Sequence, residues 1–168
     1  MLQTRYGVPP ERVAALDAQM EALFRSEGLS FAAGDGVVGN TFDAHQVLAW
    51  ADTQGLALPL LDRLMTAYFS ESRSVFDVAS LAALASDVGL APEAAREALA
   101  SGRHADAVDH DLAEARAIGI TGVPFFLFGR RFAVSGAQSE EVLLDALTEA
   151  WAHRASAPAV PDPDATSA

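Results

Sequence analysis

Residues 119–136, GITGVPFFLFGRRFAVSG, have a pattern unlike the rest of this alanine-rich chain. Residues 123–128 are apolar and β-prone, residues 129–131 form a predicted turn, and residues 132–134 form a return strand. A nearly continuous apolar strand is typical of a sheet that is covered on both faces. An isolated two-stranded hairpin is only marginally stable. The stretch therefore predicts a β-hairpin that needs neighbouring structure.

Helices are predicted for most of the remaining sequence, because apolar residues recur at helical spacing between capping residues and glycines. Asn40 is predicted to cap the second helix, with Asp43 in the capping-box position. Ser139 is predicted to cap the last helix. Four apolar residues of that helix are predicted to face inward: Val142, Leu143, Leu147 and Trp151. The predicted helices span residues 9–26, 40–54, 59–70, 78–89, 92–101, 104–118 and 140–154.

The composition excludes several classes of function. The 168 residues carry 11 basic and 23 acidic side chains, a net charge of −12. This charge argues against a nucleic-acid surface or binding to anionic lipid. No apolar run approaches the roughly 20 residues that span a bilayer, and the first residues lack a signal-peptide pattern. We expect a cytoplasmic protein without nucleic-acid or membrane partners, with a disordered tail at residues 155–168.

The chain contains no cysteine, which excludes a disulfide, a thiolate metal site and a cysteine nucleophile within these residues. One group of potential metal ligands stands out on the predicted helix of residues 104–118. Its spacings are common on any solvated acidic helix, so we predict no metal site. The group consists of His104, Asp106, Asp109, His110 and Asp111.

This chain resembles the DsbA-like thioredoxin-fold family, and within that family it is most similar to the FrnE-like cytoplasmic branch. The matching residues are 114–147, EARAIGITGVPFFLFGRRFAVSGAQSEEVLLDAL, in which TGVPFF combined with AVSGAQ is the specific signature. YGVPPE, NTFDAHQVLAWA and AYFSESRSVFD resemble the same branch. The resemblance implies a predominantly α-helical α+β fold over residues 1–154. A helical insertion would span about residues 9–118, and the hairpin and last helix about residues 119–154.

The resemblance also implies where substrate binds. In the family, a Val-Pro peptide in the cis form lies opposite the redox-active C-x-x-C motif and offers its backbone to protein or small thiol substrates. Thr121, Gly122, Val123 and Pro124 would form this loop, although a trans proline is also tolerated at a strand start. Family members carry a strand and a C-P-x-C helix before the point at which this chain starts. The expected fold is therefore a truncated thioredoxin-like one without a catalytic residue in this chain.

Three functions stay open at this stage. The first is a DsbA/FrnE-family thiol–disulfide oxidoreductase-like protein that is inactive without its cysteine segment. The second is a glutathione-dependent isomerase of the hydroxychromene-carboxylate type, in which a serine replaces the cysteine; glutathione is the one cofactor considered. The third is a non-catalytic binding or assembly module that uses an exposed sheet edge, for example as a homodimer.

Asn40 and His45 are candidate cleft residues in the helical part of the chain. In the related isomerases an asparagine in this region contacts substrate, although a helix cap also explains Asn40. His45 either faces an active-site cleft or is a partly buried helix histidine.

Overall fold

The structure is a computed structural model that describes residues 9–32 and 38–154. Those residues form seven helices and one two-stranded sheet, which confirms the predicted, predominantly helical α+β fold. The chain divides into two compact units, Met1–Leu112 and Ala113–Ala168. The division falls inside α7 (Ala105–Ile118), and each unit is described by itself. The tail predicted to be disordered lies outside the described residues.

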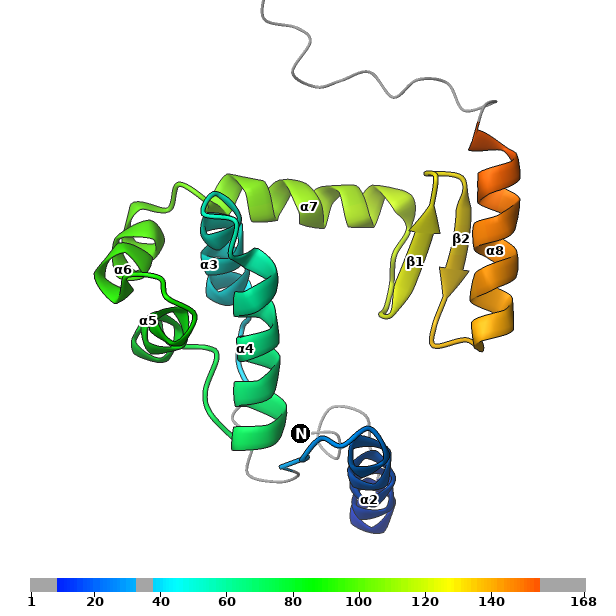
Figure 1. Ribbon diagram of the computed structural model, residues 1–168, viewed down its shortest axis with the longest axis horizontal. Helices are drawn as coiled ribbons and strands as arrows, with labels where there is room; N and C mark the ends of the chain where they lie inside the picture. The colour runs from blue at the N-terminus through cyan, green and yellow to red at the C-terminus, as the bar shows by residue number, and fades with distance from the viewer. Residues whose placement is uncertain (1–8, 33–37, 155–168) are drawn as a thin grey trace, which may run out of the picture. The chain divides into compact units, whose positions relative to one another are not determined.

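The first unit consists of α2 to α6 and the beginning of α7 (Figure 1). Proline stands at the first helical position of α2 and α6, where its lack of an N–H costs no hydrogen bond. α4 begins two residues before Pro59, because proline is tolerated throughout the first helical turn. The bounds are α2 Pro10–Ser26, α3 Phe42–Asp52, α4 Ala57–Glu71, α5 Val78–Asp87 and α6 Pro92–Ser101.

The core of the first unit lies among α3, α4, α5 and α6. Small buried side chains separate the larger ones, and alanine at a helix contact lets neighbouring helices approach closely. The high alanine content of the chain therefore serves close helix packing. The largest fully buried side chains are Val47, Leu60, Leu81 and Leu84, and the fully buried alanines are Ala51, Ala67, Ala82, Ala85 and Ala95.

The capping residue of α3 lies one position later in the chain than predicted. Thr41, and not Asn40, is the N-cap residue, and its side chain makes no capping hydrogen bond. The Phe42 N–H donates to Asn40 Oδ1 at 3.0 Å, so Asn40 still supports the helix start from one residue further out. Asp43 consequently lies at the second helical position, outside the capping-box position. Its carboxylate there still favours the positive end of the helix, and it accepts from Gln46 Nε2 at 3.1 Å.

The start of α5 confirms the predicted cap at Asp77. Asp77 Oδ1 accepts from the Ser80 N–H at 2.8 Å, and Asp77 Oδ2 accepts from Ser74 Oγ at 2.6 Å. The hydrogen bonds from the Ser74 hydroxyl and the Ser80 N–H lower the pKa of Asp77, because they stabilise its ionised carboxylate.

Arg63 of α4 links the end of its own helix to the end of α5. Its guanidinium donates to Glu71 Oε2 at 2.8 Å and to Asp87 Oδ2 at 2.9 Å. These bonds to the Arg63 guanidinium lower the pKa of both Glu71 and Asp87. The network ties together two helix ends that are far apart in the sequence.

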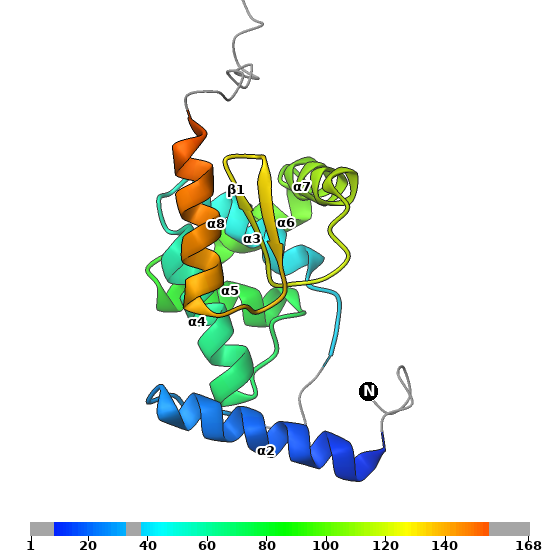
Figure 2. The same ribbon diagram turned by 90° about the vertical axis from the view of Figure 1, so that its right-hand side faces the viewer.

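The second unit contains the end of α7, the hairpin and α8 (Glu140–Ala152). Strands β1 (Phe125–Phe128) and β2 (Phe132–Ser135) are antiparallel, with Phe125 opposite Ser135 and Phe128 opposite Phe132. This confirms the predicted hairpin, although β1 begins at Phe125 and not at residue 123. α8 lies alongside the hairpin, as Figure 1 and Figure 2 show from two directions.

The turn between the strands has left-handed backbone at both central positions. Gly129 has φ of 56° and Arg130 has φ of 55°, and the Arg131 N–H donates to the Phe128 carbonyl at 3.2 Å. Positive φ at both central residues is the requirement of a type I′ turn, whose twist matches that of a two-stranded hairpin. Arg130 thus occupies a backbone position that favours glycine or asparagine.

α8 covers one face of the hairpin. Phe132, on the face that also carries Phe126 and Phe128, lies 5.7 Å from the His153 ring at the end of α8. On the opposite face, Leu127 is 37% exposed, and Ala133 and Ser135 are also exposed. Within the described residues of the second unit, the predicted cover on both faces is therefore not present.

The orientation of α8 corrects one prediction. Ser139 caps the helix as predicted, since the Val142 N–H donates to Ser139 Oγ at 3.5 Å. However, Val142, Leu147 and Trp151 are 42%, 49% and 63% exposed, and only Leu143 of the predicted inward set is half-buried. A two-stranded hairpin offers a narrow surface, so α8 buries only a narrow stripe. That stripe consists of Leu143, Ala146 and Ala150.

Candidate functional site

The end of α7 directs the chain into the predicted substrate loop. Gly119 has φ of 86°; its N–H donates to the Arg116 carbonyl at 3.0 Å, and the Ile120 N–H donates to the Ala115 carbonyl at 3.0 Å. This pair of bonds is a Schellman motif, which ends a helix with a glycine in the left-handed conformation. Gly119 therefore sets the direction in which the following loop leaves the helix.

The loop that follows is exposed along its whole length. Thr121, Gly122, Val123 and Pro124 are all exposed, and Val123 is 90% exposed. The Val123–Pro124 peptide bond is cis, the geometry that the sequence resemblance implies. The Gly136 N–H donates to the Pro124 carbonyl at 2.8 Å, which extends the hairpin ladder by one pair.

The backbone of this loop has unused hydrogen-bonding groups. Within the described part of the chain, the N–H and C=O groups of residues 121–123 make no backbone hydrogen bond. Backbone donors and acceptors that are open to solvent can pair with the backbone of an extended ligand. The arrangement suits binding of an extended segment, whereas the side chains of these residues supply no thiol and no titratable group.

In the first unit, Asn40 and His45 line one groove between α3 and α7 with a volume of about 800 Å³. His45 is exposed, so the interpretation as a partly buried helix histidine is wrong. The structure thus brings the two candidate cleft residues together. Their role in binding stays a prediction.

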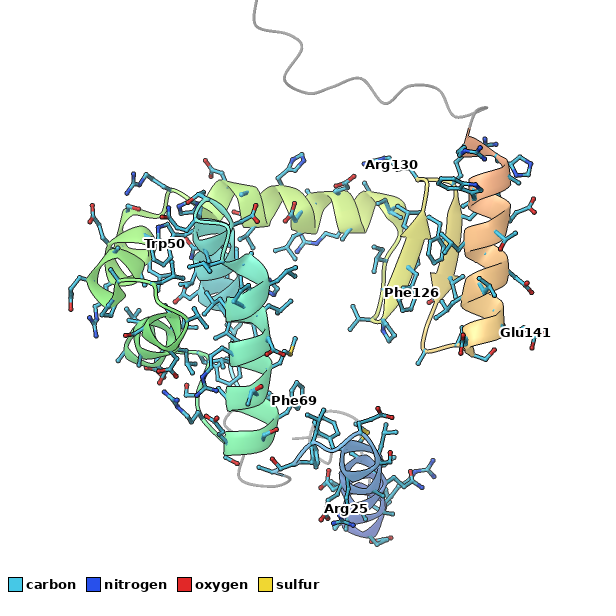
Figure 3. All side chains as sticks on the ribbon, viewed as in Figure 1. Arg25, Trp50, Phe69, Phe126, Arg130 and Glu141 are labelled. Atoms are coloured by element: carbon cyan, nitrogen blue, oxygen red, sulfur yellow. The ribbon has the colours of Figure 1, made fainter. Side chains whose placement is uncertain are left out.

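A smaller apolar groove of about 330 Å³ lies on the other side of His45, between α3 and α4. Tyr68 packs edge-on against Phe69 at 4.9 Å and against Phe76 at 5.6 Å between ring centroids. Figure 3 labels Phe69 on α4. His45 therefore stands at the border of two grooves, one with a polar rim and one almost wholly apolar.

Comparison with known proteins identifies the family. The sequence profile of the DSBA-like thioredoxin domain matches residues 3–148. The chain belongs to the DsbA-like thioredoxin domain family. The crystal structure of a probable DsbA oxidoreductase from Streptomyces coelicolor is similar to it, with a TM-score of 0.85 and 39% sequence identity over 98% of this chain and 73% of that chain. No curated protein matches the sequence.

Membership of the DsbA-like family confirms the resemblance found in the sequence at family level. DsbA-like chemistry is thiol–disulfide exchange, which requires a cysteine thiolate, and these 168 residues contain no cysteine. Among the described residues, no helix is long and apolar enough to cross a membrane. Within the same residues, no three metal-ligating side chains are grouped to hold an ion.

The candidate site residues of this DsbA-like chain fall into two sets. Thr121 to Pro124 lie in the second unit, and Asn40 and His45 lie in the first. Two residues that the sequence analysis assigned to a solvated helix face, His104 and Asp111, line the same groove as His45. His104 directly precedes α7 and Asp111 lies seven residues further along, about two helical turns. The sequence does not show which other helix lies beside this part of α7.

Proposed function

We propose that this chain is the substrate-binding part of an FrnE-like thiol–disulfide oxidoreductase and has no exchange activity of its own. Its membership of the DsbA-like family supports the reaction class. The exposed loop of residues 121–124, with unused backbone groups, supports binding of an extended protein or small thiol substrate. The observation that carries the proposal is the absence of cysteine from a chain of this family.

The chemistry limits what these residues do. In thiol–disulfide exchange a thiolate attacks one sulfur of a disulfide, a mixed disulfide forms, and the other sulfur leaves as a thiolate. The 168 residues contain no cysteine, so they supply neither the attacking thiolate nor a sulfur for the mixed disulfide. In this proposal the loop holds and aligns the substrate, and the attacking thiolate comes from outside these residues.

The test compares two versions of the protein. One is the 168-residue chain, and the other is extended at its N-terminus by the reading frame upstream of Met1. Catalysed reduction of insulin disulfides by dithiothreitol is expected only for the extended version, which would contain a C-x-x-C motif. Exchange activity in the 168-residue chain above the uncatalysed rate would overturn the proposal, as would an extended chain that has the motif and stays inactive.

Substrate binding is tested separately from exchange. Val123→Pro removes an exposed backbone N–H, and Val123→Ala keeps it while shortening the same side chain. We expect the proline variant to bind a fluorescent cysteine-containing peptide more weakly than the parent does. The alanine variant should bind it within about two-fold of the parent, because an extended peptide pairs with the backbone of the loop and not with its side chains. Equal loss in both variants would mean that the side chain is the binding group. The glutathione-dependent isomerase and the homodimer stay predictions.

A further inference from the structure

The groove between α3 and α7 has a repeated polar rim that the proposed function does not use. His45 and Asp52 line it from α3, Asp111 lines it from α7, and His104 lines it from the residue directly before α7. Each pair is seven residues apart, which corresponds to two helical turns or about 10 Å. One imidazole and one carboxylate therefore lie along the α3 side of the groove, and one of each along the α7 side.

The floor of the groove is apolar. Leu48 and Ala49 of α3 are half-buried, Val108 of α7 is 6% exposed, and Leu112 is 41% exposed. An apolar floor between polar rims is typical of grooves that take an apolar side chain while pairing polar groups at their edges. The volume of about 800 Å³ is large enough for more than one such side chain.

The fixed charges at the rim are acidic, and they have no ion-pair partner in the part of the chain that the structure describes. Of the arginines that the structure describes, none lines the groove, although the chain carries 11 basic residues. Within residues 9–32 and 38–154, Asp52 and Asp111 take part in no ion pair, whereas Glu71 and Asp87 share Arg63. Unpaired carboxylates beside an apolar floor complement a ligand that is both cationic and apolar.

We infer that this groove binds a peptide segment of a partner protein in which apolar side chains are flanked by arginine or lysine. The apolar side chains enter the floor formed by Leu48, Val108 and Leu112. The guanidinium or ammonium groups pair with Asp52 and Asp111 at the rim. A length of about 10 Å accommodates three extended residues. The inference is independent of the proposed function, since binding here involves no thiol.

The first test measures binding of two fluorescein-labelled peptides to the 168-residue chain by anisotropy. Arg-Leu-Ala-Leu-Arg is the probe, and Glu-Leu-Ala-Leu-Glu is the control with the same apolar residues. We expect the basic peptide alone to bind, and its affinity to fall with added salt, because exposed ion pairs are screened. Equal binding of both peptides, or no binding of the basic one, would overturn the inference.

The second test places the basic peptide in the groove. Asp52→Asn and Asp111→Asn should each weaken binding by about two- to five-fold, the range of exposed ion pairs. Asp109→Asn is the matched control, because Asp109 lies on the same helix but does not line the groove. Unchanged affinity in both groove variants, or equal loss in the control, would contradict the assignment.

The third test blocks the floor and uses the absence of native cysteine. Ala49→Cys can be labelled at a single site with a bulky maleimide, and Ala83→Cys on the exposed side of α5 gives a labelled control. The label at position 49 should abolish binding of the basic peptide, and the label at position 83 should leave it unchanged. Circular dichroism of the labelled proteins checks that both keep their helices. Binding that survives the label at position 49 would overturn the inference.

Discussion

The two compact units differ in how much apolar surface each buries with its own residues. In the first unit, α3 to α6 enclose a core in which Leu60, Leu81 and Leu84 are fully buried. In the second unit, none of the described hydrophobic residues is fully buried, and Leu144 and Trp151 are 57% and 63% exposed. The first unit thus has a core of its own, whereas a hairpin with one helix buries too little area for comparable stability.

One tryptophan lies in each unit, which allows this contrast to be measured. Trp50 of α3 packs against the core of the first unit (Figure 3), and Trp151 of α8 belongs to the second. Trp151→Phe leaves Trp50 as the only tryptophan, and Trp50→Phe leaves Trp151. Urea unfolding of these two backgrounds by fluorescence follows each unit separately.

The largest expected effect comes from truncating the core of the first unit. Leu81→Ala should lower the free energy of unfolding reported by Trp50 by about 2–5 kcal/mol, because the fully buried leucine leaves a cavity. Leu144→Ala, the same change at an exposed position of α8, should cost less than about 0.5 kcal/mol on the Trp151 signal. If the Leu144 change costs as much as the Leu81 change, the second unit has a core that its exposed side chains do not indicate.

A smaller effect is expected at the end of α7, where the loop to the hairpin begins. Gly119→Ala should lower the stability reported by Trp151 by about 1–2 kcal/mol, because alanine disfavours the left-handed backbone. Space is not the cause, since no atom lies within 4 Å of the added Cβ at Gly119. Gly122→Ala adds the same methyl group at an open position without positive φ. Equal losses from both changes would show that loop flexibility, and not helix termination, is what glycine provides there.

The first unit should also be sensitive to acid. The pKa values of Asp77, Glu71 and Asp87 are lowered by hydrogen bonds that the unfolded chain lacks. The stabilisation is therefore fully present above the unfolded pKa, near 4 for carboxylates, and is lost as pH falls through the lower folded values. Urea unfolding followed by Trp50 should show stability decreasing below about pH 4.

The variant Asp77→Asn separates the cap from its titration. Asparagine caps a helix about as well as aspartate, but it does not ionise. We expect near-parent stability at pH 7 and a shallower loss on acidification, whereas Asp77→Ala should cost about 1 kcal/mol at pH 7. An unchanged acid profile in Asp77→Asn would assign the acid sensitivity to the Arg63 network instead.

Local signals in the sequence predicted most of the fold, because they depend on a few adjacent residues. The proline starts of α2 and α6, the caps at Asp77 and Ser139 and the two strands follow from such signals. Features that depend on distant neighbours were not predictable. The inward face of α8 depends on the width of the surface beneath it, and the groove beside His45 depends on how α3 and α7 meet.

The smallest expected effect concerns the hairpin turn. Arg130 has a positive φ of 55° and pairs with Glu114; the Arg130 side chain is 59% exposed and the Glu114 side chain 37%. Arg130→Gly removes the strain of a side chain in the left-handed region, worth about 1 kcal/mol or less, and loses an exposed ion pair worth about 0–1 kcal/mol. The two effects oppose each other, and glycine also adds freedom to the unfolded chain, so a change within about 0.5 kcal/mol on the Trp151 signal is expected.

Arg131→Gly is the matched control for the turn, because the backbone of Arg131 does not have a positive φ. The change therefore relieves no strain and only adds conformational freedom to the unfolded chain. It should be slightly destabilising. If Arg130→Gly instead destabilises by more than Arg131→Gly, the pair between Arg130 and Glu114 holds the hairpin to the end of α7. In a unit that lacks a fully buried side chain among its described residues, a surface contact could then contribute as much as apolar packing does.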